Sequence, residues 1–318
     1  MKNKKPNLFL VGAPKAGTTS IYRFLQSHPD IFMSPIKEPH YFSKDIKSEK
    51  FSKDYSKRNY INLDQYFSNN KLPNIQIAFL ENYHQYMELY RDKKDEKYFG
   101  EGSTGYLFSR VAAKEIYNFN PDAKIIMILR NPVERTFSHW RMDSRAGYSR
   151  SDNFYKDIIF DYSLEDNTWG GVSSTYIQLG LYSQQVKRYL EYFPKENVKI
   201  FFYDEFEKNP EDIKKELFNF LNVQDVDIDF SKRYNTDFKA RNFLIHFLFK
   251  KYRSQTHFFK NIIPKKIKSF LKNIFFQQSI SNHHPINKDV RMKILSLFLH
   301  DISNLEKIID KDLSTWKV

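Results

Sequence analysis

The alternation of short apolar runs with segments of helical spacing most constrains the fold of this chain. Runs typical of strands occupy residues 7–13, 98–103, 124–130 and 198–203. The run at 124–130 is continuously apolar, which is typical of a central strand buried on both faces of a parallel sheet. Strands that alternate with helices predict an α/β fold with a mostly parallel central sheet flanked by helices.

Helical spacing and capping signals predict the elements that separate these strands. The expected helices are 20–27, 75–91, 109–119, one beginning at Pro132, 176–193 and 209–221. The polar stretch 44–71 is expected to be an irregular surface segment. After residue 237 the pattern is wholly helical and ends in a long helix at 288–309. We therefore expect one domain over residues 1–318, with an α/β core at 1–237 and a helical C-terminal region at 238–318.

The absence of cysteine and the short first apolar run bear on the cellular compartment and on the kinds of site that the chain can form. The chain has no cysteine, which excludes disulfides and thiolate metal sites. The apolar run at 8–13 is shorter than a signal-peptide core and far shorter than a bilayer span. We interpret it as an uncleaved first strand and expect a cytoplasmic protein.

Most of the net charge of +13 lies in one stretch near the C-terminus. Residues 238–288 contain eleven Lys or Arg residues and no Asp or Glu, and the rest of the chain is at +2. Such an excess indicates anionic partners in general, including nucleic acid, membrane surfaces and acidic glycans, and does not choose among them.

Residues 263–275 within this stretch have the pattern of a basic amphipathic helix. Apolar residues recur at helical spacing, while the other positions include Lys265, Lys266, Lys268 and Lys272. One interpretation is that the apolar stripe packs on the core and the lysines are solvated. The other is that residues 250–272 attract an anionic acceptor or hold the protein at an anionic membrane or acidic polymer.

The loop after the first apolar run has the composition of an anion-binding turn. Residues 12–20 read Gly-Ala-Pro-Lys-Ala-Gly-Thr-Thr-Ser, and the glycines allow backbone N–H groups to face an anion at a helix N-terminus. The two glycines have P-loop spacing, but the lysine lies inside the loop at position 15. A P-loop instead places lysine before a hydroxyl residue that binds magnesium. The order found here predicts an anion cradle that needs no metal, although Thr18 alone is better explained as a helix cap.

This loop resembles the 5′-phosphosulfate loop of sulfotransferases that use 3′-phosphoadenosine 5′-phosphosulfate (PAPS). The resemblance implies that Lys15 bridges the phosphosulfate and that the following residues bind the 5′-phosphate. It therefore assigns cofactor contacts to Lys15, Ala16, Gly17, Thr18, Thr19 and Ser20.

A second landmark follows the central strand. Arg130 ends the strand, and Ser138 comes eight residues later on the next helix. A guanidinium group can bind two phosphate oxygens while a hydroxyl adds a third hydrogen bond. Residues 124–139 resemble the family's 3′-phosphate motif, which assigns that role to Arg130 and Ser138. Taken singly, each residue has an alternative that explains it as well as phosphate binding does. Arg130 can pair with Glu134, and Ser138 can be a residue of the helix surface.

Further resemblance extends over residues 7–221 and more loosely to the C-terminus. The segment around Tyr203 is similar to the one that contacts the adenine side of the cofactor. Cytosolic members carry Arg-Lys-Gly near the 3′-phosphate, which residues 239–241 do not reproduce, so Arg241 is a candidate ligand only. Glycosaminoglycan members often carry Glu-Lys-Thr in a short strand, and residues 100–103 lack that lysine.

The acceptor side of the reaction requires a base. Residues 36–42 resemble the carbohydrate sulfotransferase segment in which a glutamate precedes aromatic positions, which favours Glu38 as the base. His40 is the rival, because an imidazole needs little tuning and cytosolic members use a histidine. The catalytic candidates are therefore Lys15, Glu38 and His40. The alternative for Glu38 and His40 is a solvated loop whose charges pair with Lys37.

The resemblance implies transfer of a sulfuryl group from PAPS to a hydroxyl or amine of a glycan or glycolipid, with PAP (3′-phosphoadenosine 5′-phosphate) as product and no metal required. No spacing of His, Asp or Glu is typical of a metal site. A P-loop kinase is the alternative among enzymes. A nucleic-acid or membrane-binding module is the alternative outside them, although we expect no specific nucleic acid partner. An inactive sulfotransferase-like protein is a third alternative.

Overall fold

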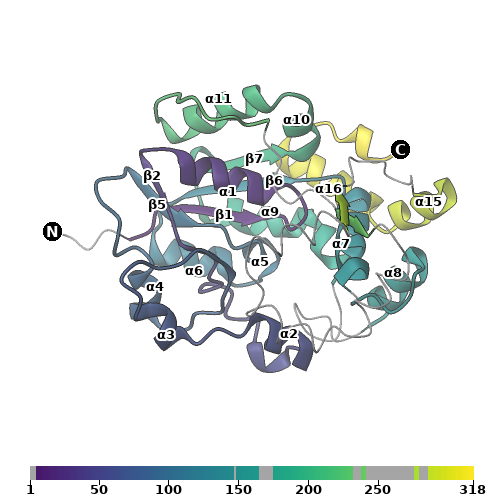
Figure 1. Cartoon of the computed structure of the whole chain (residues 1–318). Helices are drawn as coiled ribbons and strands as arrows, with labels where there is room; N and C mark the ends of the chain where they lie inside the picture. Colours follow the sequence, from purple (N-terminus) through teal and green to yellow (C-terminus); the bar gives the residue numbers. More distant parts are fainter. Residues whose placement is uncertain (1–4, 147, 165–174, 232–237, 241–275, 279–285) are drawn as a thin grey trace.

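The computed structural model describes residues 5–146, 148–164, 175–231, 238–240, 276–278 and 286–318 (Figure 1). Its centre is a parallel sheet in the order β2-β5-β1-β6-β7. The strands are β1 (Leu8–Gly12), β2 (Ile31–Met33), β5 (Tyr98–Glu101), β6 (Lys124–Leu129) and β7 (Val198–Phe202). The parallel sheet and the four expected strands are confirmed, and within this sheet the three-residue β2 is the one described strand that was not predicted.

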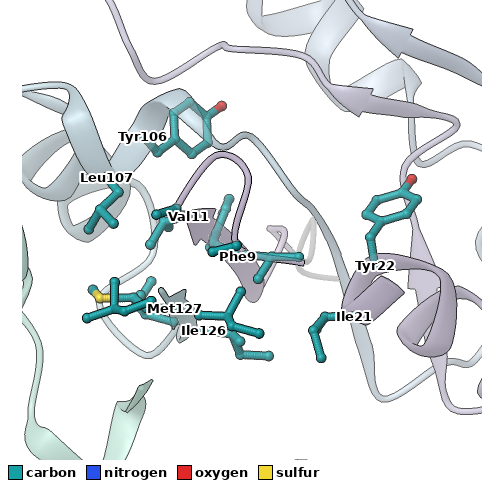
Figure 2. Packing of buried hydrophobic residues seen from close by; sticks show 14 of the residues in the cluster. Phe9, Val11, Ile21, Tyr22, Tyr106, Leu107, Ile126 and Met127 are labelled. Atoms are coloured by element: carbon teal, nitrogen blue, oxygen red, sulfur yellow. The ribbon is translucent and has the colours of Figure 1, made fainter. Parts of the chain in front are cut away.

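The sheet is buried because its central strands are apolar on both faces. All five residues of β1 are buried, and so are the last five of β6. In Figure 1, α1 (Thr18–Ser27) and α11 (Pro210–Leu221) cover one face, and α5 (Gly105–Phe108) and α6 (Ala112–Phe119) cover the other. Figure 2 shows side chains of β1, β6, α1 and α5 meeting in this core. Burial on both faces explains why an uninterrupted apolar run identified β6.

The remaining α-helices of the described ranges pack around the sheet and its loops. They are α2 (Lys53–Asn59), α3 (Leu63–Phe67), α4 (Tyr83–Glu88), α7 (Pro132–Ala146), α8 (Phe154–Tyr162), α9 (Tyr182–Tyr192), α10 (Tyr203–Lys208), α15 (Lys288–Ser296) and α16 (Leu299–Ile309). Helix α7 begins at Pro132 as expected, because proline has no N–H to lose at the first position of a helix.

The expected helix at 75–91 is wrong in its first half. Residues Ile75–Ile77 form β4, which pairs in parallel with β3 (Ile36–Glu38), and α4 begins only after Asn82. The Asn82 side chain accepts hydrogen bonds from the N–H groups of His84 and Gln85 and so caps α4. The backbone of Ala78 continues the β pairing by donating to Glu38 O at 2.9 Å. Pairing with β3, which the sequence pattern did not predict, overrides the helical spacing.

Other boundaries also differ from expectation. The segment 44–71 contains the short helices α2 and α3, each capped by a Ser or Asn side chain. The expected helix at 176–193 is a short 3-10 turn followed by α9, and the one at 288–309 is two helices, α15 and α16. The expectation of a wholly helical chain after residue 237 is also wrong, because β8 (Phe238–Ala240) pairs antiparallel with β9 (Phe276–Gln278).

Candidate active site

The predicted donor-site residues meet where the parallel strands β1, β6 and β7 end. Arg130, directly after β6, donates from Nη1 to the carbonyl oxygen of Lys15 at 3.2 Å. Its guanidinium carbon lies 4.4 Å from the centre of the Tyr203 ring, at the start of α10. The Arg130 Nε is buried and has no hydrogen-bond partner among the described residues. A cation held in this way, with an unused donor, fits a phosphate group.

The loop between β1 and α1 has the backbone of an anion cradle. The Ala13 N–H donates to the carbonyl of Ile128 on β6 at 2.8 Å, which fixes the start of the loop to the neighbouring strand. Gly17 has φ 93°, a left-handed conformation that favours glycine, and α1 begins at the next residue. The first N–H groups of a helix lack intrahelical acceptors and are available to an anion. Thr18 and Ser20 are buried, whereas Lys15 and Thr19 are half-buried.

Tyr203 closes the cradle from the side of β7. A β-carbon built on Gly17 would lie 3.1 Å from the Tyr203 ring, so the loop packs directly on this side chain. The Lys15 Nζ lies 3.5 Å from Met142 Sδ on α7. Ser138 is half-buried on the same helix. The structure thus brings together Lys15, Gly17, Arg130 and Tyr203, while Arg241 lies outside the described residues.

A second set of hydrogen bonds, which was not predicted, fixes Arg130 and Asn131 in the loop that follows β6. The Tyr182 hydroxyl donates to the carbonyl of Arg130 at 3.1 Å. The Asn131 side chain donates to the carbonyl of Trp316 at 3.3 Å, and the Trp316 indole donates to Asp204 at 3.2 Å. Trp316 therefore joins the loops after β6 and β7. Tyr182 lay in a segment with family resemblance, but no local pattern indicated its partner.

Glu38 ends β3 and is surrounded by donors. Lys37 Nζ lies 2.6 Å and Gln76 Nε2 3.0 Å from its Oε1, and Thr104 Oγ1 donates to Oε2 at 2.8 Å. Burial alone raises the pKa of the Glu38 carboxyl, but Lys37 and His40 hold this pKa well below its usual range. Glu38 is therefore ionised. Gln76 and Thr104 come from segments that sequence reasoning did not connect with Glu38.

His40 lies beside Glu38 in the following loop. Its Nε2 is 3.7 Å from Glu38 Oε2, its Nδ1 is 3.3 Å from Ser43 Oγ, and its ring stacks on Phe79 with 4.6 Å between ring centres. The alternative of a solvated loop is wrong, because Glu38 is only 7% and His40 only 3% exposed. The expected pairing of Glu38 with Lys37 is present.

Other titratable groups are not part of these clusters. His139 is half-buried on α7, and loss of solvent around its ring lowers its pKa to about 4, so it is neutral near pH 7. His246, His283 and His284 lie outside the described residues. Among the residues that the structure does describe, no group of three or more His, Asp or Glu could hold a metal ion. Within the same ranges, no helix is long and apolar enough to span a bilayer.

Comparison with known proteins agrees with this arrangement. A family model described as "Sulfotransferase family" matches residues 6–227. This range includes the group around Lys15, Arg130 and Tyr203 and the pair Glu38 and His40. The chain belongs to the sulfotransferase family. Membership of this family argues against the P-loop kinase alternative.

The chain is similar to proteins named as sulfotransferases. Carbohydrate sulfotransferase 15 of Mus musculus is 26% identical over 253 residues, which cover 69% of this chain and 44% of the mouse protein. The membrane-associated sulfotransferase kil1 of Dictyostelium discoideum is 22% identical over 90% of this chain and 66% of its own length. The chain thus spans less than half of the length of the mouse relative.

A solved structure matches almost the whole chain. The sulfotransferase from Alicyclobacillus acidocaldarius superimposes with a TM-score of 0.69 at 27% identity, covering 99% of this chain and 100% of that protein. The parallel sheet and flanking helices are therefore the sulfotransferase fold.

Proposed function

We propose that the sulfuryl donor is PAPS and that Arg130 binds its 3′-phosphate. The observation that carries the proposal is the Arg130 guanidinium, which is stacked on Tyr203, tied to the Lys15 carbonyl and left with a buried Nε donor. The cradle at residues 13–20 adjoins it and offers the N–H groups of a helix N-terminus to the 5′-phosphate. Ser138 adds a hydroxyl from α7.

The proposed reaction is in-line transfer. A hydroxyl or amine of the acceptor attacks sulfur, the new O–S or N–S bond forms, and the bond from sulfur to the 5′-phosphate oxygen breaks. The proton of the attacking group goes to Glu38, and Lys15 stabilises the charge that moves onto the phosphate of PAP. The low pKa of Glu38 opposes proton uptake, so the adjacent His40 Nε2 remains the rival acceptor.

We propose a carbohydrate or glycolipid as the acceptor. Relatives named as carbohydrate sulfotransferase and as heparan sulfate glucosamine 3-O-sulfotransferase support this class. The cytoplasmic location stays a prediction. The contact of residues 250–272 with an anionic surface also stays a prediction, because those residues lie outside the described part of the chain.

Titration calorimetry with EDTA present tests the donor site. PAP should bind without metal, and Arg130→Ala should weaken PAP far more than adenosine 5′-phosphosulfate, which lacks the 3′-phosphate. Arg91→Ala in the turn after α4, which removes a cation paired with Glu88, serves as the control. Undetectable PAP binding together with tight magnesium-dependent ATP binding would overturn the proposal. Transfer of radiolabelled sulfate from PAPS to desulfated heparin, chondroitin and extracted glycolipids then tests the acceptor class.

A further inference from the structure

Glu101 is a buried carboxyl group at the end of β5 that the proposed reaction does not use. It is 0% exposed, so it cannot touch an acceptor or donor. Its Oε2 accepts a hydrogen bond from Ser103 Oγ at 2.5 Å, and its Oε1 accepts from Tyr106 OH at 2.7 Å and Tyr86 OH at 3.1 Å. Burying a carboxyl group is costly unless such hydrogen bonds compensate.

Two of these hydroxyl groups connect Glu101 to the loop that follows Glu38. The His40 N–H donates to Ser103 Oγ at 3.1 Å, and the Phe42 N–H donates to Tyr106 OH at 3.2 Å. Each oxygen of Glu101 thus ends a relay that begins at a backbone N–H, one at residue 40 and one at residue 42. Two fixed N–H groups two residues apart determine the path of the loop.

The loop needs such fixing because His40 has an unfavourable backbone conformation. Its φ is +52°, a left-handed value that costs a residue with a β-carbon about 1–2 kcal/mol. The surroundings accommodate this conformation. A β-carbon on Gly105 would lie 2.7 Å from the His40 ring, so only glycine leaves room for the ring. Thr104, between Ser103 and Gly105, donates to Glu38 itself.

We propose that Glu101 is a positioning residue that holds the loop at residues 40–42, and with it Glu38 and His40, through Ser103 and Tyr106. The effect of Glu101 on catalysis rests on the proposed role of Glu38. The effect of Glu101 on the position of the loop does not rest on it, because that position can be measured without any substrate. Burial raises the pKa of Glu101, and the hydrogen bonds from Ser103, Tyr106 and Tyr86 oppose this rise.

Hydrogen exchange of the loop amides, measured by mass spectrometry on the intact chain, tests the placement. Ser103→Ala should speed exchange at His40 at least about tenfold and leave Phe42 slow, whereas Tyr106→Phe should do the reverse. Ser103→Thr keeps the hydroxyl and should restore protection. Tyr90→Phe removes a hydroxyl that bonds only Tyr86 in this network and is the matched control. Unchanged exchange in both relay variants would overturn the proposal.

Turnover of PAPS with desulfated heparin tests the catalytic consequence. Glu101→Gln keeps the size of the side chain but presents an NH2 group that cannot accept a relay hydrogen bond, and the assay is run at pH 9, above the pKa of about 8 of Glu101, where both carboxyl oxygens of the parent accept. We expect kcat to fall roughly 10- to 100-fold with PAP affinity unchanged, because small misplacements of a reacting group have effects of this size. Glu101→Gln should have no further effect in a Glu38→Gln background. An equal loss in that background, or a parallel loss of PAP affinity, would show that Glu101 does not act through Glu38. If Glu38→Gln leaves kcat unchanged, Glu38 is not the base. Hydrogen exchange at His40 and Phe42 then tests the placement of the loop by itself.

Discussion

Glu38 and Glu101 are both buried carboxyl groups, yet the pKa of one is lowered and the pKa of the other is raised. Lys37 and His40 more than offset the burial of Glu38, whereas the hydroxyl donors around Glu101 do not offset its burial, and the nearby Glu38 raises the pKa of Glu101 further. The sequence indicated Glu38 through its resemblance to a family segment. It did not indicate Glu101, because the partners Tyr86, Ser103 and Tyr106 come together only in the folded chain.

Replacing the proposed base separates the two candidates. Glu38→Gln should keep PAP affinity and lower turnover roughly 100-fold or more, since removal of a general base has effects of this size. His40→Asn should cost less. Glu115→Gln, which disrupts a half-exposed pair with Lys44, is the matched control. Steady-state kinetics and PAP calorimetry on all three variants supply the measurements. A nearly silent Glu38→Gln beside an inactive His40→Asn would assign the base to His40.

The raised pKa of Glu101 predicts a dependence of stability on pH. Burial raises this pKa from 4.5 to about 8, so the folded protein holds a proton that the unfolded chain releases. The stability from this group is therefore complete below pH 4.5 and is lost as pH rises through 8. The slope is at most about 1.4 kcal/mol per pH unit. Glu38 titrates in the folded state below this window, so it does not interfere.

Urea unfolding of the parent and of Glu101→Gln between pH 5 and pH 9 measures this effect. The free energy of unfolding of the parent, relative to the variant, should fall between about pH 5 and pH 8 and then level off. A difference that stays constant with pH would mean that Glu101 is ionised in the folded protein.

At the scale of elements, the longer strands of the central sheet were easier to predict than the short strands and the helix boundaries. The strands β1 and β5 are buried throughout, β6 over its last five residues and β7 over its last two, and burial imposes an apolar run that is visible locally. The prediction of a helix over 75–91 was wrong because the first residues of this segment pair with β3. Local hydrophobic spacing cannot reveal a contact between residues about forty positions apart, such as Ile36 and Ile75. The division of residues 288–309 into α15 and α16 at Leu297 likewise carried no glycine or proline signal.

The loop before α1 was predicted best, because its glycines have a backbone role. Gly17→Ala places a β-carbon on a residue with φ 93° and 3.1 Å from the Tyr203 ring. We expect a loss of about 1–2 kcal/mol in stability and a roughly tenfold or greater weakening of PAP binding. Ser27→Ala, at the exposed far end of α1, is the matched control. Thermal unfolding and PAP calorimetry check the result, and unchanged PAP affinity would place the phosphate away from this loop.

At the scale of the molecule, the site depends on segments far apart in the chain. Trp316 contacts the loops after β6 and β7, and Ser183 on α9 hydrogen-bonds Asp301 on α16. The sequence predicted the turns after the first and the central strand that carry Lys15 and Arg130. It did not predict that the C-terminal residues support them, because side-chain hydrogen bonds of this kind leave no periodic pattern.

The charge distribution of the whole chain also separates into two parts, and this leads to a prediction. The acid-free stretch at 238–288 holds eleven basic residues, while the remainder of the chain is at +2. If the stretch attracts an anionic surface, the chain should co-sediment with vesicles of anionic lipid at low salt, and high salt should release it because ions screen the attraction. Neutral vesicles should not bind.

Charge reversal identifies the residues responsible. Replacing Lys265, Lys266, Lys268 and Lys272 by Glu should abolish vesicle binding and raise the KM for an acidic acceptor, while PAP affinity stays unchanged. The matched control reverses four exposed lysines of the described core, Lys94, Lys187, Lys208 and Lys215, which changes the net charge equally. If both variants lose binding to the same extent, net charge alone is responsible. If the first variant folds, binds vesicles like the parent and keeps its acceptor KM, the four lysines have no recruiting role, and solvation on a packing helix accounts for them.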